Sequence, residues 1–390
     1  MSYTQSFVLF GYTLTRTFFM TFIPFDLEHT QSRWEQVVDY NLTESGVHPI
    51  RLDELLGDTA GIDDLLGTEI GYPHVNGNPE LREHIANLYD GTALENVIVT
   101  VGAAEANNII MQTLMEPGDE LLTQIPTYKQ VWGLAKNSGY TVREFCLQPE
   151  KNWALDLEAL EAGVTDKTKI IAVVNPNNPT GYIMTEAEMD AVVRAADKVG
   201  AWILADEVYR GAERVQDEEA ASFIGRYEKV LAVGSMSKGY ALPGLRLGWI
   251  VGPANTVDDI WRRHEYTTIT ASKLSNLLAA HALSPAVRPR LINRTREYIR
   301  NGFPVLESWM TGQEGLFSWT PPQASAVTFV HYHLDINSTE LMEILCREAR
   351  VFVGAGDSFG MDHHFRIAFG QERSVLEEAF SRIENTLKSI

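Results

Sequence analysis

Two stretches of sequence, Lys169–Gly181 (KIIAVVNPNNPTG) and Ala201–Tyr209 (AWILADEVY), decide the fold class of this chain. Each begins with a continuous apolar run, KIIAVV or AWILA, which is typical of a strand buried on both faces. The segment between them, residues 186–198, has the apolar spacing of an amphipathic helix. A strand, a helix and a strand in this order predict parallel strand pairing in an α/β fold.

The same alternation continues on both sides of these stretches. Strands are predicted over residues 97–101, 120–123, 140–145, 230–233 and 248–251, and helices over residues 105–115 and 128–137. The pattern is mainly helical from Pro253 to Met310; beyond Phe317 it predicts strands over 326–333, 350–353 and 364–369 and helices over 339–347 and 374–387. We therefore expect a large domain with a mostly parallel sheet, a smaller α/β domain, and an N-terminal arm that also contributes to the small domain: residues 61–295, 296–390 and 1–60, respectively.

The composition of the chain limits its classes of function. Among 390 residues, 32 are Lys or Arg and 52 are Asp or Glu, so the formal charge is −20 at pH 7. Nucleic-acid binding relies on cationic contacts to phosphate, and an anionic membrane surface repels an acidic chain, so we expect neither partner. The two cysteines, Cys146 and Cys346, provide no disulfide framework and predict a cytoplasmic protein.

The first 25 residues are apolar, and Arg16 is their only charged residue. A secretory signal carries basic residues before its apolar stretch, which this segment lacks. Gly11 and Pro24 interrupt the run, so a membrane span is not predicted either. We expect an arm that packs on the body or on a partner subunit, or a chain whose functional start is Met20.

Polar residues and glycines follow four of the predicted strands. They are Gly102–Glu105 (GAAE), Asn175–Gly181 (NPNNPTG), Asp206–Tyr209 (DEVY) and Gly234–Gly239 (GSMSKG). Ligands of such sheets bind beyond the carboxyl ends of the strands. Each motif alone is compatible with a turn, a helix cap or tight packing. Together they offer an amine, an acid, a phenol, an amide and a helix N-terminus, which suit a phosphorylated cofactor bound through an amine.

The motifs NPNNPTG, DEVY and SMSKGYALPGLRLGW (Ser235–Trp249) carry a resemblance. Over about residues 24–390 the chain resembles the class I/II aminotransferases, pyridoxal-phosphate (PLP) enzymes of fold type I. The resemblance implies a homodimeric enzyme that moves an amino group between an amino acid and a 2-oxo acid through a Schiff base on Lys238.

The resemblance also implies roles for the residues around the cofactor ring. Lys238 would form the internal aldimine, and Asp206 would keep the pyridine nitrogen protonated. Asn178 and Tyr209 would hydrogen-bond the ring 3-oxygen, and Tyr128 would stack on the ring. A lysine beside a cationic ring and away from water has its charged form disfavoured, so we expect Lys238 to be a nucleophile.

Further roles concern the phosphate and the substrate. Tyr72 would reach the phosphate of the partner subunit, and Arg366 would clamp the substrate α-carboxylate in a bidentate geometry. The remaining phosphate ligands would be the backbone amides of Ala103 and Ala104 and the side chains of Ser235, Ser237 and Arg246.

Two features depart from the family pattern. Ala104 stands where the family often has Ser or Thr, so one phosphate hydrogen bond is expected to be missing. The segment 44–48 (ESGVH) replaces the usual substrate loop, and we assign Gly46 within it to substrate binding. This segment is similar to a branch that includes capreomycidine synthase, which implies a PLP-dependent cyclase or lyase as the alternative reaction.

Two other interpretations remain. A non-catalytic PLP-fold module, such as the effector domain of a transcription regulator, would need an attached DNA-binding domain, for which the first 25 residues are too short. His331 and His333 share one face of a predicted strand, and His363 and His364 are adjacent. Without matching cysteine or carboxylate spacing, no metal is predicted there.

Overall fold

The computed structural model describes residues 2–9, 12–19, 22–57, 59–313 and 315–390. Its largest sheet has eight strands in the order β4-β11-β10-β9-β8-β5-β6-β7. The strands from β10 to β6 pair in parallel, whereas β4, β11 and β7 pair antiparallel. Their bounds are β4 (Val97–Thr100), β5 (Glu120–Ile125), β6 (Thr141–Gln148), β7 (Ala154–Leu155), β8 (Thr168–Val174), β9 (Trp202–Asp206), β10 (Val230–Ser235) and β11 (Gly248–Val251). The predicted α/β fold with a mostly parallel sheet is confirmed.

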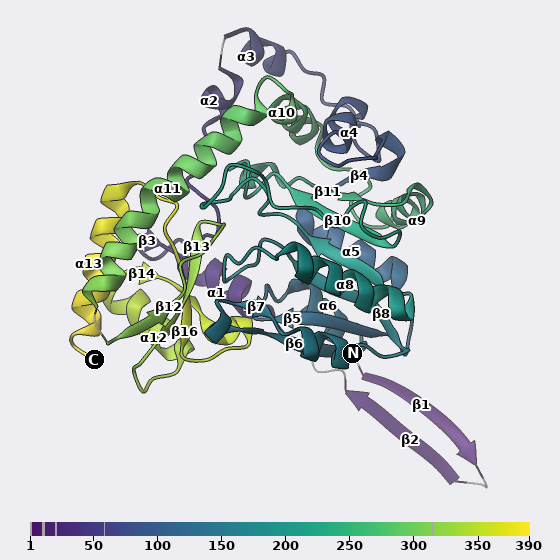
Figure 1. Cartoon of the computed structure of the whole chain (residues 1–390). Helices are drawn as coiled ribbons and strands as arrows, with labels where there is room; N and C mark the ends of the chain where they lie inside the picture. The colour runs from purple at the N-terminus through teal and green to yellow at the C-terminus, as the bar shows by residue number, and fades with distance from the viewer. Residues whose placement is uncertain (1, 10–11, 20–21, 58, 314) are drawn as a thin grey trace.

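Helices cover both faces of this sheet (Figure 1). Along β8, Ile170 and Ala172 pack with one set of helices, while Ile171 and Val173 pack with the other. The first set is α5 (Gly102–Leu114), α6 (Gln130–Asn137) and α9 (Ala254–His264); the second is α7 (Leu157–Gly163) and α8 (Glu186–Val199). The apolar run of β8 is explained by this arrangement, because successive side chains of a strand point to opposite faces.

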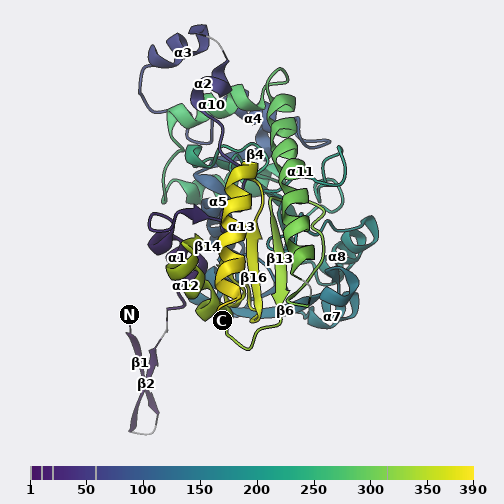
Figure 2. The ribbon, with the colours of Figure 1, turned by 90° about the vertical axis from the view of Figure 1, so that its left-hand side faces the viewer.

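A second sheet has four antiparallel strands in the order β12-β13-β16-β15. Its strands are β12 (Phe317–Trp319), β13 (Val327–Tyr332), β15 (Gly354–Ala355) and β16 (His364–Ala368). Figure 2 shows α11 (Arg288–Gly312) and α13 (Arg373–Leu387) running beside β13 and β16. They share an apolar core with the sheet and with α12 (Ser338–Ile344).

The N-terminal part of the chain contributes to this second region. β3 (Tyr40–Asn41) pairs in parallel with β14 (Val351–Phe352), and Leu42 packs in the core of the four-stranded sheet. The remaining helices are α1 (Asp26–Trp34), α2 (Leu52–Leu56), α3 (Thr59–Leu66), α4 (Pro79–Ala86) and α10 (Lys273–Leu283). The domain boundaries at residues 60 and 295 stay predictions.

The first residues form an antiparallel hairpin of β1 (Ser2–Leu9) and β2 (Tyr12–Phe19). In Figures 1 and 2 the hairpin projects away from the rest of the chain. The packing of this arm on the body or on a partner subunit stays a prediction. Met20, the alternative start expected from the sequence, lies outside the described residues, as does Met1. Within the described ranges, no helix combines the length and apolar character needed to cross a membrane.

Helix α8, which supports β8 and β9, begins at a capping box. Thr185 Oγ1 accepts a hydrogen bond from the Glu188 amide (3.3 Å), and the Glu188 carboxylate accepts one from the Thr185 amide (2.7 Å). We expect Thr185→Ala to lower the free energy of unfolding by about 1 kcal/mol, because one amide loses its partner. Urea denaturation measures this change; Thr185→Ser, which keeps the hydroxyl, is the control, and equal stability of the Ala variant would contradict the prediction.

Candidate active site

The carboxyl ends of β8, β9 and β10 border a cavity of about 390 Å³. Most of the site residues predicted from the sequence line it: Ala103, Ala104, Tyr128, Asn178, Asp206, Tyr209, Ser235, Ser237, Lys238, Arg246 and Arg366. Gly46 lies beside it, since a Cβ at Gly46 would be 3.8 Å from Lys238 Cδ. Tyr72 lies elsewhere, 88% exposed on the surface between α3 and α4. The structure thus brings the predicted residues of this chain together, with Tyr72 apart.

Asp206 is the last residue of β9 and is buried. Its Oδ1 accepts a hydrogen bond from the Val208 amide (3.2 Å), and its Oδ2 accepts one from Asn107 Nδ2 (3.4 Å). Burial raises the pKa of Asp206 to about 6, although both hydrogen bonds oppose the rise. A cation at the open side of this carboxylate would stabilise its charged form.

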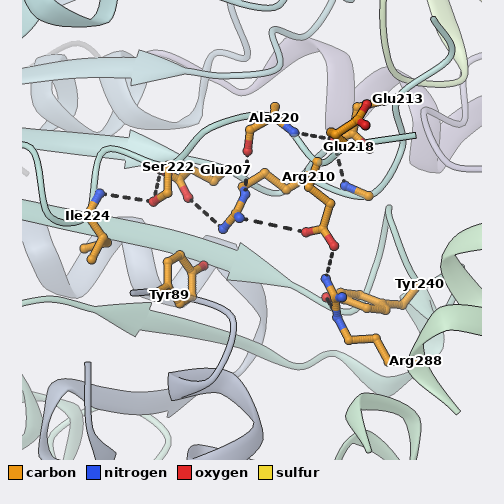
Figure 3. Close-up of polar contacts among 12 residues, drawn as sticks. Tyr89, Glu207, Arg210, Glu213, Glu218, Ala220, Ser222, Ile224, Tyr240 and Arg288 are labelled. Carbon is orange, nitrogen blue, oxygen red and sulfur yellow. Dashed lines mark hydrogen bonds and ion pairs between the residues drawn. The ribbon is translucent and has the colours of Figure 1, made fainter. Parts of the chain in front are cut away.

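The next residue, Glu207, anchors the segment on the side away from the cavity. Its Oε1 accepts hydrogen bonds from Ser222 Oγ (2.8 Å) and the Phe223 amide (2.9 Å), and Arg210 Nη1 lies 3.5 Å from its Oε2. Arg210 and Arg288 of α11 both pair with Glu219, so the network continues towards α11, as Figure 3 shows. Glu207 is buried and its carboxylate is satisfied, so it fixes the backbone that carries Asp206.

Lys238 lies in the loop after β10, and its side chain is 21% exposed. Its Nζ is 2.8 Å from Glu44 Oε1. Burial is the largest influence on Lys238 and disfavours its charged form, but Glu44 and Tyr209 together outweigh it, and the pKa of Lys238 lies above its ordinary value. This net effect is opposite to the disfavoured charge expected from the sequence, because that expectation did not include the Glu44 carboxylate. The pKa of Glu44 falls to about 2, because the charges of Lys238 and Arg366 and a hydrogen bond from the Gly46 backbone lower it by more than burial raises it.

One end of the cavity is suited to an anion. Gly102, with a φ of 72°, is the first residue of α5, and Ala103 and Ala104 line the cavity at this helix N-terminus. Arg246 Nη1 lies 3.5 Å from Ser237 Oγ and donates to the Pro243 carbonyl (3.0 Å). A Cβ at Gly102 would lie 2.9 Å from Arg246 Nη2, so glycine keeps this cradle open.

Arg366 enters the cavity from β16 of the second sheet and is 2% exposed. Its Nη1 donates to Asn178 Oδ1 (2.9 Å) and its Nη2 donates to the Thr43 carbonyl (2.6 Å). The ring of Phe359 lies 5.1 Å from its guanidinium carbon. The guanidinium is therefore held rigidly at the boundary of the two sheets, in a place where it can meet a carboxylate.

Two tyrosines complete the lining near Lys238. Tyr209 is buried, and its hydroxyl has no hydrogen-bond partner among the described residues. The Tyr128 hydroxyl donates to Glu28 Oε1 (2.5 Å), and burial with this carboxylate holds the pKa of Tyr128 well above its usual range. The Tyr128 ring packs against Phe25 at 5.0 Å.

Sequence reasoning missed several residues of the cavity. Glu28 and Gln31 come from α1, and Glu44 and Ser45 come from the segment after β3. Glu44 belongs to the segment 44–48 that departs from the family pattern, so the acidic residue in this segment could have been identified from the sequence as a candidate site residue. Glu28 and Gln31 belong to no sequence motif that indicates a site. Only tertiary packing brings α1 to the cavity, so the sequence alone does not reveal them.

These groups match the chemistry of PLP. The buried carboxylate of Asp206 is complementary to a protonated ring nitrogen, and the unpartnered hydroxyl of Tyr209 can donate to a ring oxygen. The cradle at Gly102 with Ser237 and Arg246 suits a phosphate. Lys238 supplies an amine for a covalent bond. The donor set of this chain therefore fits the cofactor.

A histidine cluster lies on the second sheet, outside this cavity. The His331 ring is 4.7 Å from that of His333 and 4.9 Å from that of His364. Among the described residues, no three His, Cys, Asp or Glu side chains are grouped so that they could hold a metal ion.

Three comparisons place the chain among known proteins. Residues 60–383 match the family described as "Aminotransferase class I and II". Capreomycidine synthase of Streptomyces vinaceus is 30% identical over 357 residues, which are 89% of each chain. The crystal structure of a PLP-dependent aminotransferase from Streptococcus suis has a TM-score of 0.88 and 30% identity, and the match covers 94% of this chain and 98% of that one.

A second similar structure is that of the PLP-dependent cyclase OrfR, with a TM-score of 0.84 at 24% identity, covering 94% of this chain and 97% of that one. At this identity the likeness concerns the fold alone. The family match covers most of the sequence, and the relative in S. vinaceus aligns over nearly all of it. The chain therefore belongs to the class I and II aminotransferase family, whose members are PLP-dependent enzymes of fold type I.

Proposed function

We propose that this protein is an aminotransferase that moves an amino group between an amino acid and a 2-oxo acid. The observation that carries the proposal is that one cavity contains Lys238, Asp206 and Arg366. An amine, a buried acid and a fixed guanidinium are the three groups that cofactor attachment, electron withdrawal and carboxylate binding require. Bound PLP supplies an electron-withdrawing ring that stabilises negative charge at the substrate Cα.

Each residue has its own part in this reaction. Lys238 would hold the cofactor covalently, and its Nζ, once free, would remove the proton from the substrate Cα as a general base. Asp206 would hold the positive charge on the ring nitrogen. Arg366 would orient the amino acid by its α-carboxylate, so that the Cα–H bond faces Lys238.

The test of this function is a product analysis. The holoenzyme is incubated with a panel of amino acids and 2-oxo acids, and products are identified by mass spectrometry. Transamination gives a new 2-oxo acid paired with a new amino acid in equal amounts. The absence of such a pair with every member of the panel would contradict the proposal.

A second candidate function is an amino-acid cyclase or lyase reaction that uses the same lysine. The similarity to capreomycidine synthase supports it, as does the segment 44–48, which brings Glu44 to Lys238. A cyclised or eliminated product formed without consumption of the 2-oxo acid would identify this reaction in the same assay.

Replacement of Arg366 separates substrate binding from cofactor binding. We expect Arg366→Lys to lower kcat/KM by at least roughly thirtyfold for every amino acid, because an ammonium cannot make two parallel bonds to a carboxylate. The visible absorbance of the bound cofactor should stay almost unchanged. Steady-state kinetics with an amino acid and its decarboxylated amine provide the comparison. An equal loss of kcat/KM for both substrates would mean that another residue binds the α-carboxylate.

We further propose a cytoplasmic homodimer as the active form. Tyr72 is 88% exposed, and Leu66 and Ile70 beside it are also exposed, which is typical of a surface that a second subunit covers. From such a position Tyr72 would reach the phosphate of the partner subunit. Light scattering of the holoenzyme tests the assembly, and a monomeric mass would contradict it.

A further inference from the structure

The ion pair between Glu44 and Lys238 is a feature that the proposed roles leave unexplained. Glu44 Oε1 lies 2.8 Å from Lys238 Nζ, and the two side chains are 33% and 21% exposed. The residues are 194 positions apart in the sequence, so only the fold brings them together. A partly buried pair of this kind is screened less by water and salt than a surface pair.

The backbone holds Glu44 firmly in this place. Leu42 pairs with two strands: its amide donates to the Phe352 carbonyl (2.8 Å), and its carbonyl accepts from the Ala368 amide (2.8 Å). The Thr43 carbonyl accepts from Arg366 Nη2 (2.6 Å), and the His48 amide donates to the Gly370 carbonyl (2.9 Å). The segment that carries Glu44 is thus fastened on both sides of the carboxylate.

The carboxylate itself is also oriented. Gln31 Nε2 lies 3.4 Å from Glu44 Oε2, so the oxygen that does not meet Lys238 has a neighbour on α1. Gly46 brings the following backbone close to the lysine, since a Cβ there would be 3.5 Å from the Ser237 carbonyl and 3.8 Å from Lys238 Cδ. The geometry therefore presents one carboxylate oxygen to Nζ.

We propose that Glu44 is a positioning residue for Lys238. When Lys238 is not bonded to the cofactor, Glu44 holds its Nζ at the cavity and keeps this group protonated. The inference rests on the proposed covalent role of Lys238. It adds a function for the segment 44–48, which departs from the family pattern.

The charges that face Lys238 support this role. Burial, the largest influence, and Arg366 oppose the charged form of Lys238, whereas Glu44 and Tyr209 favour it, and the net effect is a pKa above the ordinary value. Without the Glu44 charge, Tyr209 alone faces burial and Arg366, so the pKa of Lys238 should fall. Each unit of this fall makes the neutral amine about tenfold more abundant at a pH below the pKa.

Covalent loading of the cofactor reports this proton directly. The neutral amine attacks the aldehyde carbon of PLP, a carbon–nitrogen double bond forms, and the aldehyde oxygen leaves as water. Starting from the ammonium, two of its three protons leave with that oxygen, and the third stays on nitrogen. The rate of this step therefore rises with pH until Lys238 is neutral.

The experiment follows loading of the full-length chain after its cofactor has been removed. Stopped-flow fluorescence detects docking of PLP, and borohydride quenching with mass spectrometry measures the covalent step from pH 6 to pH 11. The rate of the parent should still be rising at pH 10.5, because the pKa of Lys238 lies above that ordinary value. For Glu44→Gln we expect the pH midpoint of the covalent step to lie at least about one unit lower, and the rate at pH 7.5 to rise about tenfold. Docking itself should change little.

Glu28→Gln is the matched control, because it removes another carboxylate of the cavity whose partner is Tyr128. We expect its pH midpoint to equal that of the parent. Glu44→Asp keeps the charge but shortens the side chain, so its midpoint should lie between those of the parent and Glu44→Gln. An unmoved midpoint in both Glu44 variants, or an equal shift in Glu28→Gln, would overturn the inference.

Lys238→Ala in the same series separates this inference from the proposed function. If that variant still forms a borohydride-stable bond to the cofactor, the covalent role of Lys238 is wrong. If only the Lys238 variant loses the covalent step and the Glu44 variants behave as the parent, the proposed function stands and the role of Glu44 is wrong.

Discussion

Lys238→Ala should abolish covalent attachment of PLP and reduce turnover to less than about one ten-thousandth of the parent rate. The physical reason is that one amine serves both as the nucleophile for the cofactor and as the base for the substrate Cα, and groups that act as a unit show losses of this size when removed. The measurement is intact mass after borohydride reduction, together with product formation under saturating cofactor.

The matched control for this variant is Lys151→Ala, because Lys151 is exposed and lies in the short helix after β6, outside the cavity. It should bind and reduce PLP as the parent does. Docking of PLP to Lys238→Ala should persist, since the cradle at Gly102 and Arg246 is unchanged. A cofactor mass that remains on Lys238→Ala after reduction would show that another residue attaches it.

The strands of the large sheet were predictable from the sequence because their cores are continuous apolar runs. β8 and β9 match the predicted ranges within one residue. The start of α5 was missed by three residues: it begins at Gly102, whose positive φ allows the chain to turn directly from strand to helix. α7 was missed altogether, because its seven residues are too short for a clear helical period.

The parts of the cavity that sequence reasoning placed are those at strand ends, where the parallel sheet brings distant motifs to one edge. The contribution of α1 and of Glu44 depends on the pairing of β3 with β14, two strands of two residues each. Pairing of such short strands leaves no periodic signal. The bond between Arg366 and Asn178 joins the two sheets, and it could not be foreseen because no sequence pattern shows how one sheet packs against the other.

The last prediction concerns Asp206, whose buried carboxylate is the proposed partner of the ring nitrogen. We expect Asp206→Ala to lower the rate of transamination at least about a hundredfold, because removal of a charge-stabilising group in a water-poor site costs about this much. The fold and the covalent bond to Lys238 should persist. Single-turnover kinetics and borohydride trapping measure the two properties, and near-parental turnover with bound cofactor would contradict the role.

Asp206→Asn separates charge from shape, since its side-chain oxygen can still accept from the Val208 amide. In the cofactor-free chain, the pKa of Asp206 is raised from 3.8 to about 6, so the carboxyl group favours folding when it is neutral. That contribution is complete below pH 3.8 and is lost as the pH rises through 6. At pH 7.5, Asp206→Asn should therefore unfold at a higher urea concentration than the parent when cofactor is removed, although the loaded variant is slower. A lower stability of the cofactor-free Asn variant would mean that the carboxylate already has a cationic partner within the protein, and that the ring nitrogen is not needed to balance it.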